Sequence, residues 1–319
     1  MRGQASLLII IALTLSHIAS AAAPTDDALG RAEELVDGYY GDSAQLRVAA
    51  DLVSKTLSGE PSARAYTLAA RIVMKSGHIE LVEFRPGTKD LYRQLIGRAL
   101  ALDPRYVPAL SLMSESDLLG GDIRGACEAA QRGVQVDPND PWIHLDLSRC
   151  YARLGDRGLE FEQRNIAARA GPGSTQRQRR AYVAAMEDEV RAIATPANVG
   201  SMRESAAQAE AAMDPRDAWT LGSLAEDFEL VADYDDAAIY ARKALHVMDY
   251  PAGHSILAAA MYGKAAQLKL AHQKYAETLK QAQAAGGPPD LIIGEFDWAR
   301  APQEVARLAP TVRELMNRH

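Results

Sequence analysis

The sequence predicts an all-α fold, in which antiparallel helix pairs stack into a right-handed superhelical solenoid. Two Asp-Pro pairs, Asp103-Pro104 and Asp137-Pro138, lie 34 residues apart, and Pro172 follows after another 34 residues. A fixed spacing of that size is typical of helical repeats. Alanine is abundant and aromatic residues make up only 6% of the chain, which favours closely packed helices over sheets.

Residues 1–23 are predicted to be an export signal peptide. Arg2 supplies a positive start, Ala5 to Leu15 is an apolar core of 11 residues, and small residues around Ala21 suit cleavage. The alternative is an uncleaved membrane anchor, but the apolar run is shorter than the roughly 18 residues that a spanning helix needs. We therefore expect a periplasmic or secreted protein, with no membrane span after signal removal.

Residues 24–60 are predicted to form N-terminal capping helices. Two segments of helical pattern, 27–39 and 42–57, make a helix pair ahead of the first repeat. The end helices of a solenoid must cover its exposed apolar end, and this pair is placed to do so.

Residues 61–285 are predicted to form the repeat array. Counted from Val107, Pro141, Ala218 and Ala252, equivalent positions hold similar residue types. The twentieth position holds, in that order, Ala126, Glu160, Ala237 and Ala271. Turn signals recur between the helices of a pair, at Gly120-Gly121-Asp122, Gly155-Asp156 and Asp233-Tyr234-Asp235.

These positions resemble the tetratricopeptide repeat (TPR) family, and the export signal makes the chain similar to exported bacterial TPR proteins. A small residue at position 20 lets two helices approach closely, and larger residues at positions 11 and 24 fill the remaining space. The chain departs from the family at two places. The family's tryptophan at position 4 is absent, and Glu160 and Arg164 replace the packing residues of their unit.

The expected units lie near 61–106, 107–140, 141–174, 175–217, 218–251 and 252–285. The first and fourth are longer because each carries an insertion, near 77–90 and 194–200. Residues 286–319 are predicted to form a C-terminal cap over the last repeat, and docking of this tail to a partner is the alternative.

Motifs that carry chemistry are missing from the sequence. The histidines after the signal are not paired at metal-ligand spacing, and no phosphate-binding loop or nucleophile elbow occurs. We therefore predict no catalytic residue, no metal and no cofactor. The formal net charge of −7 disfavours binding of nucleic acid through a general field.

The two cysteines, Cys127 and Cys150, are expected at nearly the same height on consecutive antiparallel helices. They lie 11 residues before and 12 residues after Pro138, which separates those helices. Two alternatives stand: a disulfide that links two repeats, favoured by export to an oxidising compartment, and two buried free thiols.

The resemblance implies that the first helix of each pair lines a concave groove through positions 2, 5, 9, 12 and 13. The candidate partner-binding residues at these positions are Trp142, Leu145, Arg149, Arg153, Trp219, Glu226 and Glu229. Arg149 and Arg153 are one helical turn apart and suit a carboxylate-bearing segment. The alternatives are that the arginines bond acids in the next repeat and that the tryptophans pack between repeats.

A basic cluster, Arg177, Arg179 and Arg180, lies near the start of a predicted helix. The favoured interpretation is a solvated helix end; the alternative is an acidic contact, to which the unfavourable placing of positive charge against the helix dipole points.

Taken together, these features predict a non-catalytic protein–protein interaction scaffold of the cell envelope that holds a partner protein or peptide segment in its groove. One alternative is an enzyme or enzyme subunit with a dispersed site near the insertions. Another is a solenoid that binds a glycan or a small acidic ligand at Arg149 and Arg153.

Overall fold

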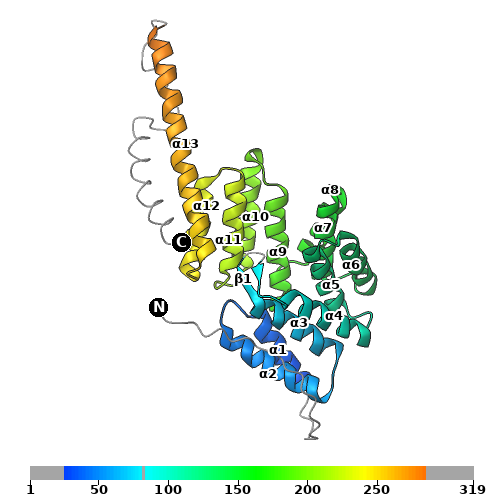
Figure 1. The fold of residues 1–319 in the computed structure, drawn as a ribbon. Coiled ribbons are helices and arrows are strands. Elements are labelled where there is room, and N and C mark those ends of the chain that lie inside the picture. Colours follow the sequence, from blue (N-terminus) through cyan, green and yellow to red (C-terminus); the bar gives the residue numbers. More distant parts are fainter. Residues whose placement is uncertain (1–24, 81–82, 285–319) are drawn as a thin grey trace. The chain divides into compact units, whose positions relative to one another are not determined.

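The computed structural model describes residues 25–80 and 83–284, which form an array of helices and one short β-hairpin (Figure 1). The predicted signal peptide and the predicted tail at 286–319 lie outside these residues. The helices are α1 (Thr25–Asp37), α2 (Ser43–Gly59), α3 (Ala63–Gly77), α4 (Thr88–Leu102), α5 (Val107–Gly120), α6 (Ile123–Val136), α7 (Pro141–Leu154), α8 (Arg157–Arg169), α9 (Gln176–Ala192), the 3-10 helix η1 (Pro196–Asn198), α10 (Val199–Ala212), α11 (Ala218–Leu230), α12 (Tyr234–Val247) and α13 (Pro251–Ala284).

The chain divides into two compact units, Met1–Ala185 and Met186–His319. In the first unit, consecutive helices pack as pairs, α1 on α2, α3 on α4, α5 on α6 and α7 on α8. In the second unit, α11 packs on α12 and α12 on α13, while Val190 of α9 and Met202 of α10 belong to the same hydrophobic core. The predicted fold class, an all-α array of antiparallel helix pairs, is confirmed for the described residues.

Aspartates and glycines define the turns inside the helix pairs. Gly121 and Gly155 adopt φ angles of 82° and 80° directly after α5 and α7, a conformation that glycine tolerates at a helix C-terminus. Asp122 and Asp156 follow them and cap α6 and α8, accepting hydrogen bonds from the backbone N–H of Gly125 and Leu159. The turn signals in the sequence therefore act as paired stop and start signals.

Both insertions lie between helices. Between α3 and α4 the chain forms an antiparallel hairpin of β1 (His78–Glu80) and β2 (Glu83–Phe84). Between α9 and α10 it forms the short helix η1. The extra residues thus extend the connections and leave the helices themselves intact.

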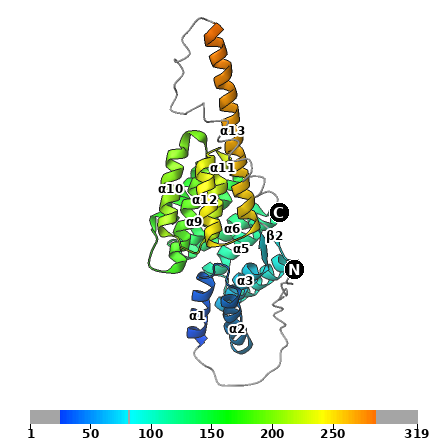
Figure 2. The ribbon, with the colours of Figure 1, turned by 90° about the vertical axis from the view of Figure 1, so that its left-hand side faces the viewer.

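The last expected unit differs from the prediction. Residues 252–285 were expected to form a helix pair, but α13 is one helix of 34 residues that runs on past α12 (Figures 1 and 2). The physical reason is local. The Gly-Asp turn of the earlier units is replaced around Gly263 by Lys264, Ala265 and Ala266, which continue a helix readily.

A disulfide joins Cys127 of α6 to Cys150 of α7, with the two Cα atoms 5.5 Å apart. Both cysteines belong to a core cluster that includes Ile143 and Leu147. The bond links the second helix of one pair to the first helix of the next, which is the disulfide of the two alternatives that the sequence left open.

Replacing both cysteines by alanine is expected to lower the free energy of unfolding by about 3 kcal/mol. The reason is that the crosslink closes a loop over a sequence separation of 23 residues and so restricts the unfolded chain. Urea denaturation of the wild type with and without reductant, beside the Cys127→Ala, Cys150→Ala variant, measures the difference. Alkylation of both cysteines in protein that has not been reduced would contradict the disulfide.

Candidate functional site

Charged side chains recur at one position of the first helices of three consecutive pairs. Arg71 of α3, Glu115 of α5 and Arg149 of α7 are each the ninth residue of their helix. This is one of the positions that the TPR resemblance places on the groove. With Lys75 and Asp146 they make up what we call the charged face.

Glu115 occupies the middle of the charged face. The Tyr92 hydroxyl on α4 donates a hydrogen bond to the Glu115 carboxylate at 3.0 Å. Burial, and then the negative charge of Glu115, raise the pKa of Tyr92 well above its usual value. The charge of Glu115 also acts on Lys75 and on Asp146, so these groups lie within electrostatic reach of one another.

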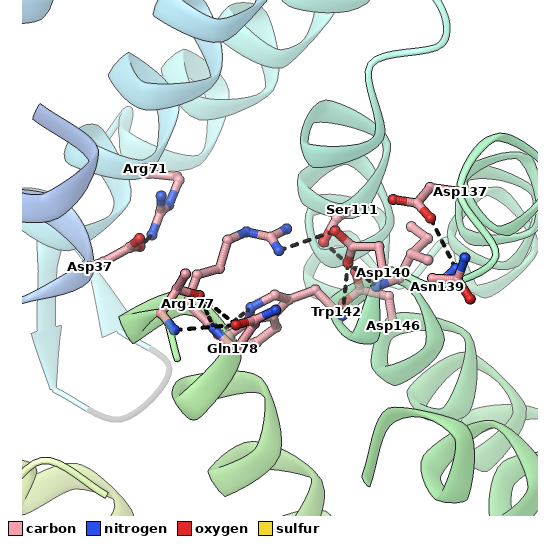
Figure 3. Close-up of polar contacts among 12 residues, drawn as sticks. Asp37, Arg71, Ser111, Asp137, Asn139, Asp140, Trp142, Asp146, Arg177 and Gln178 are labelled. Carbon is pink, nitrogen blue, oxygen red and sulfur yellow. Dashed lines mark hydrogen bonds and ion pairs between the residues drawn. The ribbon is translucent and has the colours of Figure 1, made fainter. Parts of the chain in front are cut away.

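Asp146 is buried on α7 and accepts a hydrogen bond from the Ser111 hydroxyl of α5 (Figure 3). Burial raises its pKa to about 7, while the hydrogen bond from Ser111 and the charge of Arg149 act in the opposite direction. A buried acid with a displaced pKa beside charged groups is a recognised mark of a functional site.

The pKa of Lys75 is displaced downward, whereas that of Asp146 is displaced upward. Burial lowers its pKa to about 7, and the positive charges of Arg180 and Arg71 lower it further, against the negative charges of Asp37 and Glu115. Its ammonium lies 5.4 Å from the centroid of the Tyr39 ring. The side chain is half-buried, so solvent still reaches it.

The start of α9 contacts α7 (Figure 3), and it also contacts the end of α1. The Trp142 indole N–H on α7 donates to the Arg177 carbonyl at 3.1 Å, and the Arg177 guanidinium pairs with Asp140 at 3.1 Å. Arg180 donates to the Asp37 carbonyl at 3.0 Å and lies 4.8 Å from the centroid of the Tyr40 ring. The basic cluster therefore contacts partners within the chain, and the expected solvated helix end is wrong for Arg177 and Arg180.

A cavity of about 540 Å³ lies between α1 and the start of α9. Two of its carboxylates are neutralised within the chain, since Glu33 pairs with Arg64 and Asp37 pairs with Arg71. The lining residues are Gly30, Glu33, Glu34, Asp37, Gly38, Thr175, Gln176 and Arg177.

The predicted partner-binding residues of α7 have different environments. Arg149 is half-buried on the charged face, and Arg153 is exposed one turn further on. Leu145 is 0% exposed, so the prediction that it contacts a partner is wrong, because its side chain is enclosed in the core. Trp142 is half-buried and contacts α9, which corresponds to the packing alternative rather than to a free aromatic anchor.

The predicted residues of the second unit lie on α11. Trp219, Glu226 and Glu229 are all half-buried. Burial and the neighbouring Glu226 raise the pKa of Glu229. Asp227 between them is buried and pairs with Arg191 at 3.0 Å, and burial raises its pKa to about 6. The structure therefore places these residues on one helix of the second unit, α11.

Sequence reasoning missed Arg71, Lys75, Tyr92, Asp146 and the role of Arg180. A signal for the first two was present, since the position count used for the other units applies to α3 as well. It then gives Arg71 position 9 and Lys75 position 13. The insertion at 77–90 lengthens that unit and hides its period in the sequence.

Two further features concern the described part of the chain. No three His, Cys, Asp or Glu side chains in it gather as metal ligands would. The absence of metals and cofactors stays a prediction. Within residues 25–80 and 83–284, no helix combines the length and the apolar character needed to cross a lipid bilayer.

Comparisons with known proteins concern the fold. No family model and no curated protein matches the sequence. A crystal structure of the APC/C hetero-tetramer Cut9–Hcn1 is similar at 15% identity and a TM-score of 0.48, over 92% of this chain and 59% of that chain. The structure of Naa15/Naa10 bound to HypK-THB is similar at 14% identity and a TM-score of 0.37, over 81% of this chain and 37% of that chain. A crystal structure of the TPR domain of P58(IPK) is similar at 14% identity and a TM-score of 0.25, over 92% of this chain and 79% of that chain.

This chain thus spans 59% and 37% of the length of the first two of these structures. At such identities and TM-scores the likenesses say nothing about partners or activity. The helix pairs and the turns that join them define the chain as a helical-repeat protein.

Proposed function

We propose that this chain is a non-catalytic scaffold that holds a segment of a partner protein along the charged face of its first unit. The observation that carries the proposal is the alignment of Arg71, Glu115 and Arg149 at one position of three consecutive first helices. Charged groups at equivalent positions of stacked repeats form a continuous row. An extended peptide can follow such a row from one repeat to the next.

The displaced pKa values of Lys75 and Asp146 support a binding role for this face. Both groups are partly or fully removed from water in their charged forms, which costs free energy. A protein that needed only stability would favour apolar residues there. Retention of such groups is typical of surfaces that recognise charged ligands.

We also propose that the protein works in the cell envelope of a bacterium, periplasmic or secreted, after removal of residues 1–23. The predicted signal peptide supports this, and so does the Cys127–Cys150 disulfide, since disulfides persist in oxidising compartments.

Site-specific photo-crosslinking tests the scaffold. A photo-reactive amino acid at Arg153, exposed one turn beyond Arg149, is expected to crosslink one protein in intact cells. The same amino acid at Glu128, exposed on the second helix α6, serves as the control and is expected to yield only background. Equal adducts at the two positions, or none at Arg153, would contradict the proposed face.

A further inference from the structure

The last helix, α13, exposes an aromatic side chain at a position that is covered in earlier helix pairs. The eleventh position of the repeat holds Asp117 in α5, Phe228 in α11 and Tyr262 in α13. Asp117 is 4% exposed and Phe228 is 0% exposed, and Phe228 stacks on Tyr240 of its own second helix, α12. Tyr262 is 65% exposed, because α13 runs on as one helix and, within the described part of the chain, no second helix returns over it.

Two further residues extend this exposed surface along α13. Ala266 and Leu270 follow Tyr262 at intervals of four residues, so the three side chains lie along one side of the helix. Ala266 is exposed and Leu270 is 54% exposed, whereas Leu268 is buried in the core of the second unit. We call Tyr262, Ala266 and Leu270 the α13 stripe. Apolar side chains that gather in water are typical of a contact surface, because burying them is favourable.

The segment that follows α13 has a composition that suits this stripe. Residues 291–298 read Leu-Ile-Ile-Gly-Glu-Phe-Asp-Trp, which gives five large apolar side chains, two carboxylates and no cation. Burying the apolar side chains on another apolar surface would lower the free energy. Lys269 is exposed next to Leu270, so its positive charge complements the carboxylates of Glu295 and Asp297.

The length of the connection also fits. The helix ends at Ala284, and the sequence continues with Gly286-Gly287-Pro288-Pro289, a run that stops a helix. Leu270 lies 14 residues before Ala284, which is about 21 Å along the helix axis. The seven residues that lead from Ala284 to Leu291 span up to about 23 Å when extended. Leu291 can therefore reach Leu270, and the segment can continue from there toward Tyr262.

We propose that residues 291–298 return along α13 and cover the α13 stripe. This contact is separate from the charged face of the first unit, and it gives the expected C-terminal cap a defined stretch and a defined surface. Tethering favours this occupant over a second copy of the chain. A short connection holds the segment near the stripe at an effective concentration in the millimolar range, which a free molecule has to exceed.

Photo-crosslinking in the full chain tests the contact. A photo-reactive phenylalanine derivative at Tyr262 keeps an aromatic ring at the site, and it is expected to form an adduct with a peptide from residues 291–298. The same amino acid at Phe161, an aromatic residue of α8 that is 54% exposed, is the matched control and is expected to form no such adduct. Mass spectrometry of a mixture of isotopically labelled and unlabelled protein shows whether both halves of an adduct come from one molecule.

Hydrogen exchange gives a second measurement. Replacing Ile293 and Trp298 by serine removes two of the large apolar side chains, so amides of α13 around Ala266 are expected to exchange about tenfold faster. Val312→Ser with Leu315→Ser makes the same kind of change elsewhere in the tail and is the control, which is expected to exchange as the wild type does.

Several results would overturn the inference. Adducts that join a labelled to an unlabelled molecule would assign the stripe to a second copy. Adducts with another stretch of the tail, or none at Tyr262, would exclude residues 291–298 as its occupant, and so would unchanged exchange in Ile293→Ser with Trp298→Ser. None of these results bears on the proposed scaffold, which crosslinking at Arg153 in the first unit tests by itself.

Discussion

Replacing Phe228 by alanine is expected to remove about 3–5 kcal/mol from the stability of the second unit. The Phe228 side chain is 0% exposed in a core built by α9 to α13. Its ring stacks on that of Tyr240 with the ring centroids 5.5 Å apart. Such an aromatic pair contributes about 0.5–1.5 kcal/mol to stability beyond the burial of its apolar surface. Alanine would leave a cavity in this core, and the surrounding helices can relax into it only in part.

Hydrogen exchange measured on peptides of α11 and α12 reports this loss locally, because amides there open with the free energy of their own unit. Leu230 supplies the control. It lies on the same helix and is 75% exposed, so Leu230→Ala is expected to change stability by less than about 0.5 kcal/mol. Similar exchange in the two variants would mean that Phe228 does not anchor this core.

Replacing Glu160 by alanine is expected to cost about 3–5 kcal/mol, because it strands a buried arginine. Glu160 and Arg164 occupy the two positions of α8 where the repeat pattern calls for a small and a bulky residue. Their side chains are 6% and 4% exposed and form an ion pair at 3.0 Å. Arg157, which is exposed on the helix surface, also pairs with Glu160, and the distance between the two charged groups is 2.7 Å.

The companion variant removes both charges. Glu160→Met with Arg164→Met keeps the volume and leaves no buried charge, so it is expected to regain most of the lost stability and to equal or exceed the wild type. Urea denaturation of the single and double variants measures the coupling. Arg157→Ala, which removes a side chain that is 74% exposed, is the control and is expected to cost no more than about 1 kcal/mol. A double variant as unstable as Glu160→Ala would show that the pair itself, and not the stranded charge, is what the unit needs.

The 34-residue spacing, the turn residues and the alanine positions determined the helix pairs. These signals are local. An aspartate cap, a glycine with positive φ and a small residue each affect the chain within a few residues of their own position. The same locality explains the failure at 252–285, where equivalent alanines recur but the turn does not. It also explains why Cys127 and Cys150 were expected at matching heights from their distances to Pro138.

The sequence by itself therefore determined the class of fold, the order of the helices and the places of the insertions. Only the tertiary structure decided which charged groups meet. Arg180 reaches the Asp37 carbonyl across 143 residues, and Gln176 reaches Tyr40 across 136. Such contacts depend on the small rotation of each helix pair, added up over successive repeats. The pKa of Lys75 depends in turn on the burial that those contacts create, and no residue spacing contains that information.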